Sequence, residues 1–385
     1  MSSTTASIAP IRKAPTAVAF LGFSALLILA VISQEHSTNR NIFSALLVTP
    51  TAGATRWQQK LARFGATPAV PDTLGETHNF TVAACVIVKD AEAYFEEWID
   101  YHVGAMKVDQ VYLYDHSVDF ELERWYINSR ADPIYRKTEV MHYKFTGHSY
   151  NEEKDGYNQN VVYGDCMDRF GKDGPKHDYM IFIDIDEFLV PQDERFSSVH
   201  SILEEYLVPF GGALVVNWML FGTANKTVYS PVPVTKRFQY RDSEANGVIK
   251  SIVKSSDYRS HKNPHGVNLL GNATVHTTKY PGRVHQASSS TGASDNERPS
   301  SVVLLYHYRF TSMKEHVFKR CFRKNYLGSS DWCNKKGTGL REDVPEHILP
   351  RPGSVYDDTA WKLLTKYVPK YRLYEDLGWK DYSRR

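Results

Sequence analysis

The sequence contains few cysteines and almost no net charge, and each of these features argues against one class of binding site. None of its four cysteines belongs to a Cys-x-x-Cys pair, which argues against a structural zinc site. The 46 Lys and Arg residues nearly balance the 44 Asp and Glu residues, and no dense basic run is interleaved with aromatics. We therefore expect no nucleic-acid partner. The chain also lacks an internal repeat, and 385 residues suffice for one large catalytic domain.

The four cysteines divide into two kinds by their surroundings. Cys321 and Cys333 lie near enough in sequence to close a loop as a disulfide. Cys85 lies in an apolar segment that predicts a strand, and Cys166 lies on a predicted helix. For these two we expect buried free thiols, the usual state of cysteine in such positions.

The N-terminal region contains a charge-free segment, residues 16–33, that follows Arg12 and Lys13. At about 1.5 Å per residue, a helix of this length spans a bilayer. The positive-inside rule places residues 1–15 in the cytosol and the rest of the chain in the lumen. A cleaved signal peptide is the alternative, but no Ala-x-Ala site follows Leu29, and this favours a single-pass transmembrane signal anchor.

The remainder of the chain divides into a stem and a catalytic domain. Residues 34–78 have little apolar periodicity and predict a stem or linker, and residues 79–385 form the expected catalytic domain. Acceptor sequons at Asn79, Asn225 and Asn272 agree with entry into the secretory pathway.

Apolar patterns in the catalytic domain predict strands that alternate with helices. Strands are expected at 81–88, 110–114, 139–145 and 179–190, and helices at 91–103, 120–129 and 152–170. Such alternation predicts an α/β fold with a Rossmann-like, mainly parallel sheet flanked by helices. The aromatic tail after Leu340 is expected to pack against this sheet as helices.

The stretch 179–190, YMIFIDIDEFLV, is the most informative motif. It predicts a buried strand with carboxylates at its carboxyl end, where open α/β sheets bind ligands. Alternation in an extended chain puts Asp184 and Asp186 on one face. Clustered carboxylates are typical of sites for a hard divalent cation, Mn²⁺ or Mg²⁺, whose usual further ligands are phosphate oxygens. A nucleotide diphosphate is thus the first candidate ligand, although an Asp-x-Asp also arises by chance in solvated turns.

An ordered set of sequence blocks resembles glycosyltransferase family 92, over roughly residues 80–325. The blocks are VIVKDAEAYFEEWIDYHVGAMKVDQVYLYDHS, HDYMIFIDIDEFLV, NWMLFGT, VIKSIVK, NPHGV and YHYRFTSMKEHVFKR. The resemblance implies a GT-A fold, a UDP-sugar donor, inversion at the anomeric carbon and a single-pass type II topology in the Golgi membrane. Because relatives include galactan synthases and galactosyltransferases, galactose is the expected sugar and a glycan or polysaccharide is the expected acceptor.

Site residues follow from the motif together with the resemblance. Asp184 and Asp186 are expected to bind the cation, and the family-like block adds His307, which by itself is more often structural. Glu187 either contacts the metal or points away into a salt bridge.

The donor nucleotide is expected at the ends of the first two strands. Lys89, Asp90 and Asp115 lie there, and Lys250 is positioned to reach phosphate oxygens; a turn role for Asp115 and solvation of Lys250 are the alternatives.

The catalytic base is not identified by the sequence. Glu244, Asp257, His261 and His265 are candidates by position, with Asp257 and His265 as weak preferences. The segment 218–223 is either part of the acceptor wall or core.

Two other functions remain open. The first is a phosphatase of the haloacid dehalogenase type, which also carries an Asp-x-Asp at a strand end. The second is a non-catalytic luminal protein that binds carbohydrate or metal.

Overall fold

The computed structural model describes the greater part of the chain from His78 onward. The described residues are 78–91, 93–117, 121–142, 159–172, 176–279, 281, 302–322, 333–334, 339–344 and 346–375. All of them belong to one compact unit, Thr67–Arg385. The predicted cytoplasmic tail, the predicted anchor and the predicted stem up to residue 77 lie outside the described residues. Among the helices that are described, none has both the length and the apolar character needed to span a membrane.

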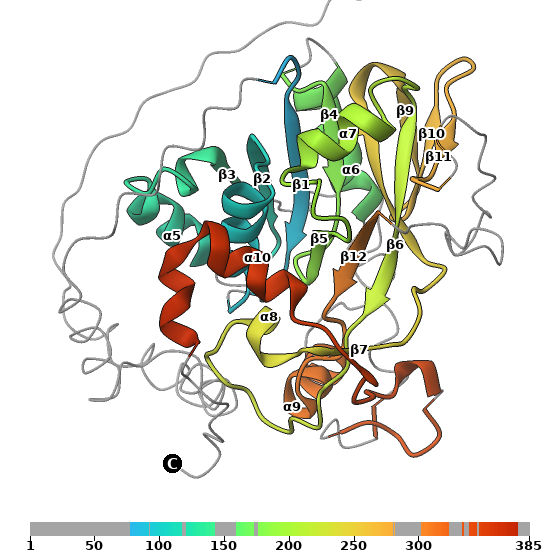
Figure 1. Ribbon diagram of the computed structural model, residues 1–385. Helices are drawn as coiled ribbons and strands as arrows, with labels where there is room; N and C mark the ends of the chain where they lie inside the picture. Colours follow the sequence, from blue (N-terminus) through green and yellow to red (C-terminus); the bar gives the residue numbers. More distant parts are fainter. Residues whose placement is uncertain are drawn as a thin grey trace, which may run out of the picture. The chain divides into compact units, whose positions relative to one another are not determined.

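A nine-stranded mixed sheet organises the described residues (Figure 1), in the order β3-β2-β1-β4-β8-β6-β12-β5, with β11 paired to β6. Its first part is parallel. β1 (Val82–Val88) lies between β2 (Gln110–Asp115) and β4 (Tyr179–Phe182), and β2 pairs with β3 (Thr138–His142). These strands arise from short apolar runs rich in Val, Ile and Tyr, as predicted.

The second part of the sheet contains two reversed strands. β8 (Ile249–Lys254) runs antiparallel between β4 and β6 (Ala213–Leu220), and β5 (Glu187–Pro191) runs antiparallel to β12 (Val303–His307). β12 and β11 (Val275–His276) are parallel to β6. Every strand of the sheet except β8 and β5 therefore points the same way, and the predicted mixed, mainly parallel α/β sheet is confirmed.

The prediction of one continuous strand over residues 179–190 is wrong. β4 ends at Phe182, the chain turns, and β5 starts at Glu187 as the partner of β12 at the far end of the strand order. Apolar periodicity does not separate one long buried strand from two short ones. Because Ile185 and Asp186 lie in a turn, the two aspartates do not share a face of an extended strand.

Two small sheets flank the large one. β9 (Tyr258–Asn263) and β10 (Gly266–Leu269) form an antiparallel hairpin, and β7 (Tyr240–Arg241) pairs with β13 (Val355–Tyr356). The second pair ties the C-terminal region to the segment after β6.

The helices are short, and several continue as wider or tighter turns. They are α4 (Phe95–Ile99), α5 (Glu121–Ser129), α6 (Gln159–Met167), α7 (Val199–Tyr206), α8 (Val234–Arg237), α9 (Met313–Val317) and α10 (Thr359–Tyr367). Wider π-helical turns follow α4, α6 and α9, at Asp100–Ala105, Asp168–Lys172 and Phe318–Phe322. The 3₁₀ turns are Tyr135–Lys137, Ser255–Asp257, Glu346–Ile348 and Pro369–Tyr374.

The C-terminal tail packs as helices, as the sequence predicts. α10 contacts β5, α8 and the turn Asp100–Ala105 (Figure 1). Trp361 on α10 is buried in the same hydrophobic cluster as Trp98 of α4.

Hydrophobic clusters cover both faces of the sheet. Successive side chains of β1 alternate between them: Val86 joins one cluster, and its neighbours Cys85 and Ile87 join the other. A strand buried on both faces is continuously apolar, which explains why 81–88 is an unbroken hydrophobic run.

The cysteines form two disulfides, Cys85–Cys166 and Cys321–Cys333. The second agrees with the loop closure expected from sequence. The expectation of buried free thiols at Cys85 and Cys166 is wrong, because α6 packs on the face of β1 that carries Cys85. That contact brings together residues 81 positions apart, which local sequence does not reveal.

Candidate functional site

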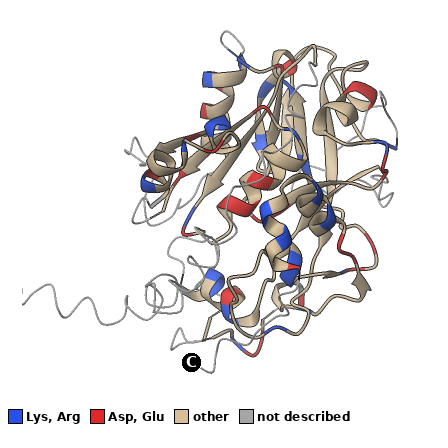
Figure 2. Cartoon of the chain, turned by 60° about the vertical axis from the view of Figure 1, so that its left-hand side comes forward, with Lys and Arg blue, Asp and Glu red and all other residues tan. Residues whose placement is uncertain are grey.

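Charged residues of both signs are spread over the described elements (Figure 2), and only a few of them are buried. Several of the buried ones gather at the carboxyl edge of the sheet. Asp184 follows β4, and His307 is the last residue of β12. Because β8 and β5 are reversed, their first residues reach the same edge, where Lys250 and Glu187 lie. The topology thus brings residues from four strands to one place.

The turn after β4 is fixed by hydrogen bonds. The Asp184 N–H donates to Glu187 Oε2 at 2.8 Å. The Trp98 indole N–H donates to the carbonyl oxygens of Glu187, at 2.8 Å, and Asp184, at 3.1 Å. Glu187 therefore points inward to hold the turn, and burial raises its pKa well above the usual value although Lys250 opposes this.

Asp184 is held by three side chains. Lys250 Nζ lies 3.0 Å from its Oδ2, and Tyr163 Oη donates to its Oδ1 at 3.2 Å, where Gln159 also donates. Lys250 is only 1% exposed and also lies 3.9 Å from Glu187 Oε2. Burial opposes ionisation of Asp184, but the Lys250 ammonium outweighs it and the pKa of Asp184 is lowered.

Asp186 is held by a different pair of side chains. Lys319 Nζ lies 2.5 Å from its Oδ2, and His307 Nε2 lies 3.5 Å from its Oδ1. Lys319 and His307 outweigh the effect of burial and keep the pKa of Asp186 well below its usual value. Burial lowers the pKa of His307 itself, which favours the neutral imidazole that a metal would bind.

Several buried polar atoms at this edge have no hydrogen-bond partner among the described residues. They are Glu187 Oε1, His307 Nδ1 and Trp218 Nε1. Buried polar groups are nearly always hydrogen-bonded, and clustered exceptions are typical of ligand sites. The edge therefore has unused hydrogen-bonding capacity for a polar ligand.

The donor set fits a divalent cation in kind, because two carboxylates and a neutral imidazole lie together. Among the described residues, however, no three His, Cys, Asp or Glu side chains are already arranged to hold a metal. The reason is visible in the contacts: each aspartate faces a lysine ammonium. A cation would have to take over at least one of these contacts.

The predicted nucleotide residues lie at the ends of β1 and β2. The Asp90 N–H donates to Ser117 Oγ at 3.0 Å, and the Ser117 N–H donates to Asp115 Oδ1 at 2.9 Å. Asp90 has φ +44°, a left-handed conformation that costs energy for a residue other than glycine. Lys89 and Asp115 are buried. These bonds join the ends of the two strands into one rigid wall beside β4.

The four candidate bases are placed very differently. His265 lies in the β9–β10 turn, its ring 5.3 Å from that of Trp218, and its Nδ1 lies 3.1 Å from the Ile249 carbonyl oxygen. Asp257 follows the other end of β8, about 16 Å away along the strand, where its Oδ2 accepts from the Gly212 N–H at 2.7 Å.

The other two candidates differ in burial and in their contacts. The His261 ring lies 4.4 Å from that of Phe182 and 5.2 Å from that of Tyr163, and Glu244 is exposed.

The segment 218–223 contributes one residue to the site. Met219, Leu220 and Phe221 are buried in the core. Trp218 belongs to the same buried cluster, and its ring is also packed between those of His265 and His307, at ring distances of 5.3 and 4.3 Å.

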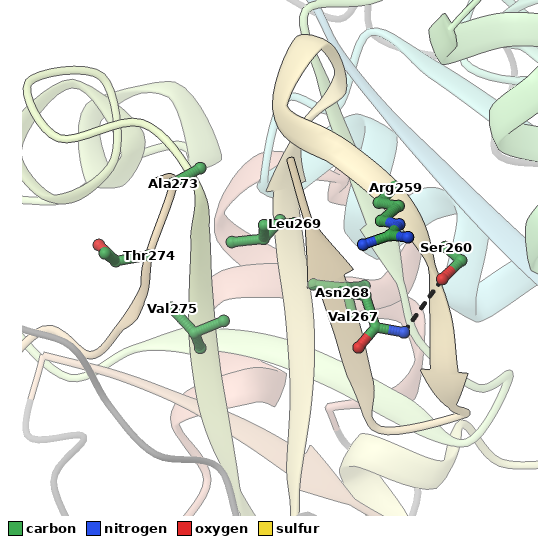
Figure 3. Close-up of a pocket in the computed structure, with 8 residues that line it drawn as sticks. All are labelled: Arg259, Ser260, Val267, Asn268, Leu269, Ala273, Thr274 and Val275. Atoms are coloured by element: carbon green, nitrogen blue, oxygen red, sulfur yellow. Dashed lines mark hydrogen bonds between the residues drawn. The ribbon is translucent and has the colours of Figure 1, made fainter. Parts of the chain in front are cut away.

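A separate pocket of about 590 Å³ lies beside the β9–β10 hairpin (Figure 3). Its lining residues are Arg259, Ser260, Val267, Asn268, Leu269, Ala273, Thr274 and Val275, with Asn268 Nδ2 donating to Ser260 Oγ at 3.0 Å. Val275 pairs with Ala213 at the start of β6, whereas His307 pairs with Leu220 at its end. This pocket is therefore at the opposite end of the strands from the aspartates.

Three site residues were missed by the sequence argument. Lys319 lies within a quoted block but is 133 positions from Asp186, and Gln159 and Tyr163 lie on a helix with no motif. A lysine or glutamine on a helix is usually solvated, so only the tertiary contacts identify these residues.

A mixed α/β sheet with buried charges and unpartnered polar atoms at its carboxyl edge is the arrangement of an α/β enzyme. Residues 78–332 match the model of glycosyltransferase family 92, so the chain belongs to this family. The family resemblance stated from sequence is thereby confirmed. No curated protein matches the chain in sequence.

Several solved structures are distantly similar. They include the bifunctional glycosyltransferase WbbM (14% identity, 40% of this chain and 24% of that one, TM-score 0.23). The mannosyltransferase PcManGT from Pyrobaculum calidifontis, solved with GDP-Man and Mn²⁺, has 13% identity, 52% and 51% coverage and a TM-score of 0.27. The galactosyltransferase LgtC has 10% identity, 35% and 46% coverage and a TM-score of 0.21. The chain thus spans between a quarter and a half of these structures.

Proposed function

We propose that the protein is a metal-dependent, inverting glycosyltransferase that transfers galactose from UDP-galactose to a hydroxyl of a glycan or polysaccharide. The observation that carries this proposal is the meeting of Asp184, Asp186 and His307 at the carboxyl edge of the sheet. Membership of a glycosyltransferase family favours it over a phosphatase or a non-catalytic binding protein. The donor and the sugar rest on the family resemblance.

Asp184, Asp186 and His307 would hold Mn²⁺ or Mg²⁺. When bound, such a cation supplies positive charge that stabilises a leaving diphosphate. Lys250 supports the same task, because its buried ammonium keeps positive charge beside Asp184 without relying on solvent. The wall formed by Lys89, Asp90 and Asp115 would hold the nucleotide.

We assign the role of general base to His265. Its Nδ1 faces the Ile249 carbonyl oxygen, so Nδ1 carries the proton and Nε2 has the free electron pair in the neutral ring. Burial and the nearby Lys250 lower the pKa of His265 to about 4, so the ring is in its basic form at neutral pH. His265 would accept the proton of the acceptor hydroxyl as that oxygen bonds to the anomeric carbon and the bond to the diphosphate breaks.

The test is a turnover assay with the full chain. Incubation with a panel of UDP-sugars, an oligosaccharide acceptor and Mn²⁺ should release UDP with UDP-galactose, and Asp184→Ala should abolish the release. The matched control is Asp193→Ala, because Asp193 is a surface carboxylate that accepts hydrogen bonds from nearby Arg195. Absence of turnover with every sugar nucleotide, or full activity in Asp184→Ala, would refute the proposal.

We further propose that the catalytic domain works in the lumen of the Golgi as part of a type II membrane protein. Two disulfides are typical of an oxidising compartment, and the sequon residues Asn79, Asn225 and Asn272 are all exposed. Peptide N-glycosidase F treatment should increase the electrophoretic mobility of the protein expressed in animal cells. No shift, together with cytosolic fractionation, would contradict this location.

A further inference from the structure

Two lysines neutralise the paired aspartates, and their side chains differ in how freely they can move. Lys250 is 1% exposed and lies between Asp184 and Glu187, inside the sheet edge. Lys319 is 22% exposed and contacts Asp186, which is 18% exposed. Lys250 cannot leave without opening the core, whereas the Lys319 side chain can move into solvent while its backbone stays in place.

The backbone that carries Lys319 is firmly fixed. Arg237 donates to both carboxylate oxygens of Glu315 on α9, at 2.9 and 3.1 Å, and this pair is buried. Ser312 caps the same helix, and His316 Nε2 lies 3.0 Å from the Ile348 carbonyl oxygen. Lys319 lies in the π-helical turn that continues α9. The hydrogen bonds of α9 therefore fix the backbone from which the Lys319 ammonium reaches Asp186.

The Lys319 ammonium group competes with a divalent cation for Asp186 Oδ2. Lys319 Nζ lies 2.5 Å from Asp186 Oδ2, which is direct contact. If both positive charges stayed, they would also repel each other at close range in a partly buried site. A cation that binds Asp186 Oδ2 in place of Lys319 leaves the displaced ammonium in need of another anionic partner.

Building on the function proposed above, we propose that Lys319 acts as a positioning residue that holds Asp186 until the donor binds. It then moves from the carboxylate to the donor diphosphate. A diphosphate carries about two negative charges and so replaces the lost partner of Lys319. The cation and the nucleotide consequently bind cooperatively. Binding of either one alone leaves a charged group without a counter-charge, whereas binding of both gives every charged group a partner.

The test measures Mn²⁺ binding directly, by electron paramagnetic resonance of free Mn²⁺, with and without saturating UDP. In the unaltered full chain, UDP should tighten Mn²⁺ binding about tenfold. Lys319→Gln should bind Mn²⁺ alone about tenfold more tightly than the unaltered chain, and UDP should add little further. Lys319→Arg keeps the charge and should preserve the dependence on UDP.

The matched control is Lys314→Gln, which removes an exposed positive charge from α9 itself. Lys314→Gln should leave the Mn²⁺ affinity unchanged, both with and without UDP. If it changed these affinities as Lys319→Gln does, the effect would come from the lost positive charge and not from the contact with Asp186. Lys319→Met serves as a second variant, and near-UV circular dichroism checks that each variant is folded.

The outcomes separate the two proposals. If Mn²⁺ and UDP bind but Lys319→Gln and Lys319→Met bind Mn²⁺ no more tightly than the unaltered chain, the role of Lys319 is refuted and the proposed function stands. If no protein binds Mn²⁺ with or without UDP, the metal-dependent function is refuted, and the role of Lys319 with it.

Discussion

Glu187 and Glu315 are both buried glutamates, but the protein uses their hydrogen-bonding capacity to different extents. Glu315 accepts from Arg237, Tyr94 and Ser312, and both of its oxygens have partners. Glu187 Oε2 accepts from the Asp184 N–H, whereas Oε1 has no hydrogen-bond partner in the part of the chain that the structure describes.

The difference separates structure from function. The polar groups around Glu315 largely satisfy one another and fix α9, so they leave little for a ligand. The groups around Glu187 leave several atoms unpartnered at an edge of the sheet, which is costly unless something binds there. Burial of charge by itself therefore does not mark a site.

Replacing Asp186 with Asn gives the sharpest contrast between the two regions. The change removes a charge that the proposed mechanism requires, so transfer should fall about 10³-fold, corresponding to about 4 kcal/mol. Because Asp186 and Lys319 are both partly exposed, the free energy of unfolding should change by less than about 1 kcal/mol. Initial rates and urea denaturation measure the two effects. Equal rates of sugar transfer in Asp186→Asn and in the surface control Asp193→Asn would show that Asp186 has no special role in transfer.

The opposite result is expected for Glu315→Gln. This change leaves the buried Arg237 guanidinium without its counter-charge, so the free energy of unfolding should fall by about 3 kcal/mol. Urea denaturation with the disulfides intact measures it. A loss below about 1 kcal/mol would show that the pair around Glu315 is not the structural element we describe.

Asp100 extends the comparison to a third buried carboxylate, far from the site. Its Oδ2 contacts Lys370 at 2.7 Å and accepts from Tyr371 at 2.6 Å and Tyr135 at 3.1 Å. Burial raises the pKa of Asp100 to about 6 although Lys370 opposes this.

A raised pKa means that the folded protein binds this proton more tightly than the unfolded chain does. The associated stability is fully present below about pH 4 and is lost as pH rises through about 6, in total about 3 kcal/mol. Asp100→Asn should remove this part of the pH dependence of unfolding. Identical pH profiles for variant and parent would show that Asp100 does not titrate in this range.

The smallest effect is expected at Trp218, with Trp98 as its matched partner. The Trp98 N–H donates two hydrogen bonds, whereas the buried Trp218 N–H has no partner. Trp98→Phe should therefore cost about 1–3 kcal/mol of unfolding free energy, and Trp218→Phe less than about 1 kcal/mol. Thermal unfolding compares them. If Trp218→Phe is as destabilising as Trp98→Phe, its N–H is not available to a substrate.

Much of the fold follows from local pattern. The strands around Cys85 and Tyr112 are short apolar runs, and each appears where the pattern predicts it. The reversal at Ile185 was not predictable, because the carboxylates there fit a strand end and a turn equally well. The sequence predicts the charged motif of the candidate site, whereas only a tertiary contact identifies Lys319 as part of it.

The family, the alternation of strands and helices, and the place of the Asp184–Asp186 motif after a buried strand can be predicted, because they depend on residues close together in the chain. The reversal of β5 and β8, the Cys85–Cys166 disulfide and the lysine that faces each aspartate appear only in the folded protein. These features depend on which distant segments pack together, and packing is settled by the burial of the whole sheet rather than by any local pattern.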